Sequence, residues 1–182
     1  IITRKLKMEG IESDKVLSYI DVLKHKKPVG KRVAIIGAGG IGFDTAEYLV
    51  HQGQSTSLNV DAFLKEWGID PTNEARAGIE GIEPHPVESP REVYLLQRKD
   101  TKVGAGLGKT TGWIHRVALK NKNVKMMNSV EYDKIDAQGL HIRIKDKPQV
   151  LEVDNIIICA GQTCNNSLYE PLKAKGKVVH II

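Results

Sequence analysis

Residues 33–42 read VAIIGAGGIG, an apolar run that leads directly into a glycine-rich turn. The apolar run predicts a buried strand, and residues 41–52 predict a helix that follows it. Between them, residues 37–42 match the pattern G-x-G-x-x-G. A glycine turn that links a strand to a helix is the context in which this pattern binds a dinucleotide.

The residues of the turn have separate physical roles. Gly37 permits the tight turn, Gly39 lets the backbone approach a pyrophosphate, and Gly42 allows the helix to pack closely on the strand. Gly40 and Ile41 stand at the start of the helix. There, free N–H groups and the positive end of the helix dipole attract phosphate groups. We therefore expect all five residues to contact a bound dinucleotide.

The rest of the chain extends this strand–turn–helix unit into an α/β fold. Apolar runs predict further strands at 93–96, 124–127 and 155–160, and residues 110–120 predict a second helix. Residues 130–153 alternate apolar and polar side chains between turn signals, which predicts a three-stranded antiparallel meander. The fold class is then a Rossmann-like parallel sheet with helices on both faces, together with this meander.

The main domain is expected to span residues 32–161. An excursion at 54–91 interrupts it, because its mixture of Ser, Asn, Pro, Gly and acidic residues breaks the strand–helix alternation. Residues 1–31 are expected to form an N-terminal segment with a helix at 13–23 and a polar linker.

The last segment, residues 162–182, is expected to lead away from the domain. It ends in VVHII at 178–182, which predicts a strand. The chain also lacks an initial Met. Because domains rarely stop within a strand, we expect the chain to be a piece of a longer protein.

The end of the second strand distinguishes NAD from NADP. An acidic residue at this position would bond the ribose 2′-hydroxyl of NAD. The chain has Gln97-Arg98-Lys99 instead, with Asp100 one position later. Two cations suit a 2′-phosphate, and an arginine can hold a phosphate with two parallel hydrogen bonds. These residues predict NADP(H), with Asp100 directed away from it.

A second glycine-rich stretch at 104–111 resembles the phosphate loop of nucleotide hydrolases. Val103 stands where that motif needs its first glycine, so the match fails by one residue. We expect Lys109 and Thr110 to reach the 2′-phosphate or the pyrophosphate instead. The alternative, an NTPase built on this loop, would show Mg²⁺-dependent ATP hydrolysis that Lys109→Ala abolishes.

Charge and composition argue against several other functions. Residues 1–32 hold nine Lys or Arg against four Asp or Glu, whereas the remaining residues balance at 18 against 18. No nucleic-acid-binding motif accompanies this basic segment, so we expect no nucleic-acid partner. No apolar run is long enough for a membrane span. The two cysteines and six histidines form no metal-ligand pattern and no catalytic set. With so few cysteines, a cytoplasmic location is expected.

Four stretches carry a resemblance to a known family: residues 31–46, 96–99, 106–116 and 153–162. They closely resemble the bacterial NADPH-dependent 2,4-dienoyl-CoA reductases. The resemblance implies a parent enzyme with an FMN-containing barrel, a 4Fe–4S cluster, and nested FAD and NADPH domains. There, hydride from NADPH passes to FAD, and the electrons pass on to FMN and then to a 2,4-dienoyl-CoA in fatty-acid β-oxidation.

This chain matches only the NADPH domain of that family, which resembles the NADPH domain of glutathione reductase. The resemblance implies that residues 1–31 come from the FAD domain and that residues 162–182 return toward it. Its partners would be the FAD and FMN barrel domains of the parent chain, and the piece by itself would be inactive. The resemblance assigns cofactor contacts to Ala160 and Gly161. Two departures are Cys164, where related folds have Pro, and Gly42, where related NADP sites often have Ala. The alternative is a trimethylamine-dehydrogenase-like protein whose domain binds ADP or is a structural relic.

Overall fold

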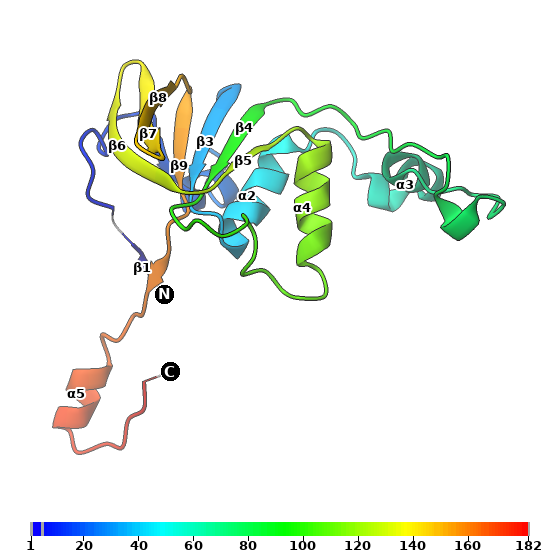
Figure 1. Ribbon diagram of the computed structural model, residues 1–182. Coiled ribbons are helices and arrows are strands. Elements are labelled where there is room, and N and C mark those ends of the chain that lie inside the picture. The colour runs from blue at the N-terminus through cyan, green and yellow to red at the C-terminus, as the bar shows by residue number, and fades with distance from the viewer. Residues whose placement is uncertain (1, 5, 182) are drawn as a thin grey trace.

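The computed structural model describes residues 2–4 and 6–181. Its centre is a five-stranded sheet in which every pair of neighbouring strands is parallel (Figure 1). The strands lie in the order β2 (Val16–Ser18), β9 (Asn155–Ile158), β3 (Arg32–Ile36), β4 (Glu92–Leu96) and β5 (Lys125–Met127).

Strand β3 shows why a continuous apolar run forms a central strand. Val33 and Ile35 belong to one hydrophobic cluster, and Ala34 and Ile36 belong to another. All four side chains are at most 1% exposed. A parallel strand covered on both faces needs apolar residues at every position, and this sequence supplies them.

Different structures cover the two faces of the sheet. One cluster includes buried side chains from α1 (Tyr19–Leu23), α2 (Gly40–Val50) and α4 (Gly112–Asn121). The other includes the antiparallel meander of β6 (Val130–Asp136), β7 (Gly139–Ile144) and β8 (Lys147–Leu151). The α/β class, the parallel sheet and the meander are thus confirmed. The helices expected on the second face are replaced there by the meander.

The N-terminal segment differs from its prediction. Residues 13–23 do not form one helix: β2 pairs in parallel with β9, and α1 begins only after it. Ser18 caps α1, because its Oγ accepts the N–H of Asp21 at 3.1 Å and its own N–H donates to Asp21 Oδ2 at 3.0 Å. Residues 16–18 form a strand because they pair with β9, far along the chain, and their own sequence does not indicate this pairing.

The C-terminal segment also differs. After β9 the chain forms β10 (Gln162–Thr163), which pairs antiparallel with β1 (Ile2–Thr3). A short helix, α5 (Tyr169–Ala174), then projects away from the sheet (Figure 1). Residues 178–181 form no strand, and residue 182 lies outside the described residues. Val178 is 88% exposed, so no burial supports the predicted strand.

The boundaries of the two main helices shift slightly. α2 ends two residues before its predicted end, and α4 begins two residues after its predicted start. The longest described helix has 11 residues. None of the helices in the described part of the chain has the length and apolar character needed to traverse a lipid bilayer.

The excursion at 54–91 forms an arm beside α4 (Figure 1). It contains two short 3₁₀ turns, Thr56–Leu58 and Arg76–Gly78, and the helix α3 (Val60–Trp67). A salt bridge of 2.9 Å joins Glu66 Oε1 of the arm to Lys122 Nζ at the end of α4. Burial opposes the charge of Glu66, but hydrogen bonds from Thr56 and Lys122 outweigh burial and lower the pKa of this carboxyl.

The loop after α3 depends on an ionised carboxylate. Asp70 accepts hydrogen bonds from the N–H of Ala75 at 2.7 Å, and from the hydroxyl and N–H of Thr72 at 2.7 and 2.9 Å. These bonds lower the pKa of Asp70 to about 2. Because the folded pKa lies below the unfolded value, the carboxylate stabilises the fold above pH ~4, and this contribution is lost as pH falls toward ~2.

We therefore expect Asp70→Asn to lower the melting temperature at neutral pH and to have a smaller effect as the pH approaches ~2.5. Thermal unfolding of both proteins, followed by circular dichroism across this range, measures the difference. A difference that does not change with pH would show that the charge of Asp70 is not what stabilises the loop.

Candidate functional site

The glycine-rich turn joins β3 to α2, and two of its glycines are required by close contacts. Gly37 has a φ of +112°, and a Cβ atom there would lie 2.6 Å from the carbonyl oxygen of Cys159. A Cβ on Gly42 would lie 1.9 Å from the carbonyl oxygen of Gly37. These contacts explain the tight turn and the close approach of the helix in atomic terms.

Gly39 and Gly40 stand beside open space instead. A Cβ at either position would meet no atom within 4 Å. Gly39 is the N-cap of α2, no side chain bonds to the first turn there, and that turn contains no acidic residue. The free N–H groups and the positive end of the helix dipole are therefore available to an anion. This open cradle fits the pyrophosphate of a dinucleotide.

A cavity of about 610 Å³ lies against this turn. It brings together residues that the sequence places far apart, namely the glycine turn, the end of β4 and the turn after β9. The predicted site residues that line it are Gly37, Gly39, Gly40, Ile41, Gln97, Arg98, Lys99, Ala160 and Gly161. Gly42 does not line the cavity, since it packs against Gly37.

The backbone after β4 is held in place by amide side chains. Gln97 Nε2 donates to the carbonyl oxygen of Thr101 at 2.8 Å, and Asn128 Nδ2 donates to that of Asp100 at 2.8 Å. The N–H of Ser129 donates to the carbonyl oxygen of Lys99 at 3.0 Å. The loop is thus fixed by its backbone and by these amides, and none of these bonds uses the charged ends of Arg98 and Lys99.

Arg98 and Lys99 are exposed cations at the rim of the cavity. Within residues 2–4 and 6–181, no carboxylate lies within ion-pair distance of either side chain. Tyr132 of β6 also lines the cavity. Burial raises the pKa of Tyr132, and the nearby charge of Arg98 partly offsets this rise. The phenol therefore remains protonated beside Arg98.

Arg4 is a cavity residue that the sequence did not indicate. It reaches the site because β1 pairs with β10, and its backbone N–H donates to the carbonyl oxygen of Gly161 at 3.3 Å. Its guanidinium carbon lies 3.7 Å from the position that a Cβ on Gly161 would occupy. The chain thus adds a third cation to the cavity, beside the turn that follows β9, whereas Arg98 and Lys99 follow β4.

Lys109 and Thr110 were predicted as phosphate contacts, but they do not line the cavity. They precede α4, which begins only at Gly112. The loop before them packs inward: a Cβ on Gly104 would lie 2.7 Å from Phe43 Cζ, and Arg116 donates to the carbonyl oxygen of Gly104 at 3.0 Å. Gly104 thus packs against α2 and α4, whereas Gly106 of the same loop lines the cavity. This arrangement does not favour the NTPase alternative.

Neither cysteine takes part in a disulfide. Cys159 is buried at the end of β9, and burial raises the pKa of its thiol to about 12. A thiol with so high a pKa is a poor nucleophile. Cys164 is exposed in the segment that leaves the domain. Within the described ranges, no three His, Cys, Asp or Glu residues form a group that could hold a metal ion.

The open position at Gly39 allows the anion site to be tested without disturbing the fold. Asp is a favoured N-cap residue, so Gly39→Asp should leave the unfolding free energy unchanged or raised. Its carboxylate would occupy the cradle and repel phosphate, and we expect dinucleotide affinity to fall on the order of 100-fold. Isothermal titration calorimetry measures this loss.

Gly39→Asn is the matched control, because it has the same shape without the charge. We expect the dinucleotide affinity of Gly39→Asn to lie between those of the unchanged chain and Gly39→Asp, because its side chain adds bulk without charge. If both variants bind a dinucleotide as tightly as the unchanged chain, the cradle is not the phosphate site.

Comparison with known proteins identifies similar domains. A family model described as pyridine nucleotide-disulphide oxidoreductase matches residues 3–179. A curated protein called metal reductase, from Desulforamulus reducens, is 23% identical over 171 residues, which cover 94% of this chain and 24% of that protein. A cinnamate reductase from Clostridium sporogenes is 46% identical over 55 residues, which cover 30% of this chain and 8% of that protein.

A solved structure has the same fold. A 2-naphthoyl-CoA reductase in complex with 2-naphthoyl-CoA superimposes with a TM-score of 0.65 at 21% sequence identity. The match covers 92% of this chain and 20% of that one. The chain therefore spans about a quarter or less of the length of these relatives.

Proposed function

Because this chain belongs to the pyridine nucleotide-disulphide oxidoreductase family, we propose that it is the NADPH-binding domain of a larger flavin-dependent reductase. At family level it is an NAD(P)-binding flavoprotein oxidoreductase domain, and the family fold implies NAD(P)H and FAD as cofactors. The observation that carries the proposal is a single cavity with an uncapped helix N-terminus on one wall and two unpaired cations on its rim.

The choice of NADPH over NADH follows from Arg98 and Lys99. Both lie at the end of β4, where the ribose 2′ position is recognised in this type of fold. Neither cation is neutralised by a carboxylate of the described residues. A guanidinium and an ammonium together complement the doubly charged phosphate, whereas the 2′-hydroxyl of NADH gains little from them.

The residues of the chain would bind and orient the cofactor. The first turn of α2 would hold the pyrophosphate, Arg98 and Lys99 the 2′-phosphate, and Arg4 and Gly161 the far end of the dinucleotide. When bound, the reduced nicotinamide supplies hydride to a flavin. The proton on the Tyr132 phenol keeps that side chain a neutral hydrogen-bond donor near Arg98.

For the parent enzyme we propose reduction of a 2,4-dienoyl-CoA, with FAD, FMN and a 4Fe–4S cluster as carriers. The names of two relatives support an acceptor whose unsaturation is conjugated to a carbonyl group: cinnamate reductase and 2-naphthoyl-CoA reductase. The FAD domain and the FMN barrel of the parent would be the partners of this chain. A cytoplasmic location is part of the same proposal.

The test is NADPH consumption by the full-length parent protein with 2,4-dienoyl-CoA as acceptor. We expect turnover with NADPH, little with NADH, and loss of turnover in Gly39→Asp. Cinnamate and a soluble ferric salt are assayed as alternative electron acceptors. Turnover with one of these, and none with the dienoyl-CoA, would contradict the proposed substrate but not the assignment of the NADPH site.

A further inference from the structure

A second groove, of about 600 Å³, lies along α4 and the edge strand β5. Apolar side chains of α4 and β5, including Val117 and Met126, contribute to its lining. Three cations, Lys102, Arg116 and Lys120, also line it. Its size falls within the range of small-molecule sites. It shares no lining residue with the dinucleotide cavity, although Thr101 of that cavity and Lys102 of the groove are neighbours in the chain.

The groove has a strongly positive lining. None of its nine lining residues is acidic. In the described part of the chain, Lys102 and Lys120 have no carboxylate within ion-pair distance. One nitrogen of Arg116 donates to the carbonyl oxygen of Gly104 at 3.0 Å, which fixes the guanidinium while leaving other N–H groups free. Such a set of donors suits a phosphorylated ligand.

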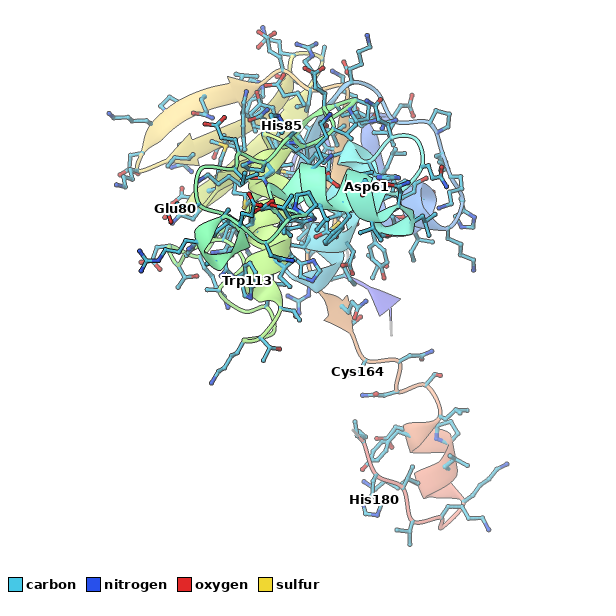
Figure 2. All side chains as sticks on the ribbon, turned by 90° about the vertical axis from the view of Figure 1, so that its right-hand side faces the viewer. Asp61, Glu80, His85, Trp113, Cys164 and His180 are labelled. Atoms are coloured by element: carbon cyan, nitrogen blue, oxygen red, sulfur yellow. The ribbon has the colours of Figure 1, made fainter. Side chains whose placement is uncertain are left out.

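An exposed aromatic ring completes this lining. Trp113 stands in the first turn of α4 (Figure 2). Its side chain is exposed, with 54% of its surface open to solvent. Its indole N–H donates to the carbonyl oxygen of Thr110 at 3.0 Å, so the orientation of the ring is set by the backbone. A fixed and exposed indole beside cations is the combination on which a nucleic-acid base stacks.

Asn128 offers a hydrogen-bond acceptor that would favour adenine over guanine. Its Nδ2 donates to the carbonyl oxygens of Asp100 and Thr101 at 2.8 and 3.4 Å. Its Oδ1 oxygen therefore remains as the acceptor of this amide in the groove. Adenine offers an exocyclic amino group as donor, whereas guanine presents a carbonyl oxygen at the same position.

We propose that this groove binds an adenosine phosphate, with the base on Trp113 and the phosphates among Lys102, Arg116 and Lys120. Two sources share this chemistry: a free nucleotide such as ADP, and the 3′-phosphoadenosine end of a coenzyme A thioester. The groove is independent of the NADPH assignment, because it uses none of the residues on which that assignment rests.

The fluorescence of Trp113 reports on the site. In a Trp67→Phe background Trp113 is the only tryptophan. At low salt, where exposed charges are least screened, we expect ADP to quench it with saturation. GDP should bind more weakly, and inorganic phosphate should leave the signal unchanged. Binding of coenzyme A more tightly than ADP would identify the thioester as the source, and the reverse order would identify the free nucleotide.

Three variants locate the origin of the fluorescence signal. Gly39→Asp blocks the dinucleotide cavity and should leave the quenching by ADP intact. The double variant Lys102→Gln, Lys120→Gln should weaken ADP about tenfold or more without changing NADPH affinity. The double variant Lys145→Gln, Lys147→Gln removes the same charge from the β7–β8 turn and the start of β8. It should change neither the affinity for ADP nor that for NADPH. Loss of quenching in Gly39→Asp, or no saturable quenching by ADP or coenzyme A up to about 1 mM, would overturn the proposal.

Discussion

Replacement of Arg98 and Lys99 together by glutamine is expected to weaken NADPH binding on the order of 100-fold and to leave NADH binding unchanged within about twofold. A hydrogen bond to a charged group contributes about 1.5–3 kcal/mol. Both side chains are exposed, so solvent screening places each contribution near the lower value. The 2′-phosphate is the group that NADH lacks, which is why the loss should be confined to NADPH.

Calorimetric titration of each cofactor measures both affinities. The matched control is the double variant Lys145→Gln, Lys147→Gln, which removes two exposed positive charges from the β7–β8 turn and the start of β8. In this control, the affinities for NADPH and NADH should change only by the small effect of the lower net charge. An equal loss for NADPH and NADH in the Arg98, Lys99 variant would refute the assignment of these residues to the 2′-phosphate.

The second large effect concerns stability. Gly42→Ala should lower the free energy of unfolding by about 2 kcal/mol, because overpacking typically costs about 1–3 kcal/mol. The added Cβ would lie 1.9 Å from the carbonyl oxygen of Gly37. That atom belongs to the backbone, so it cannot rotate away as a side chain would. The midpoint of urea unfolding, followed by circular dichroism, measures the change.

Gly40→Ala is the control within the same helix. Its Cβ meets no atom within 4 Å, so the substitution should be neutral or stabilising by up to about 1 kcal/mol through helix propensity. The two variants make the same chemical change two positions apart, and only Gly42→Ala should be destabilising. A Gly42→Ala protein as stable as Gly40→Ala would mean that α2 can move away from the turn.

The sequence predicted those elements whose signals are local. The strand, glycine turn and helix at 33–50 are encoded by neighbouring residues, and the meander follows from alternating side chains. The position of Arg98 and Lys99 at the rim of the cavity could also be predicted, because they directly follow an apolar strand. In these cases one stretch of sequence contains the whole signal.

The missed features depend on distant contacts. β2 is a strand because it pairs with β9, and Arg4 reaches the cavity because β1 pairs with β10. Neither pairing can be read from its own segment. The start of α1 was readable, since Ser18 and Asp21 have the spacing of a capping box. Lys109 was predicted in the site by analogy with phosphate loops; the loop reaches the cavity through Gly106, and Lys109 itself does not line it.

The cavity at the glycine turn is expected to select NADPH. Selectivity is measured by calorimetric titration of the unchanged chain with NADPH and NADH, side by side at moderate salt. We expect clear binding of NADPH, with NADH at least about tenfold weaker. Equal affinity for the two cofactors would contradict it, because Arg98 and Lys99 would then contribute nothing to recognition.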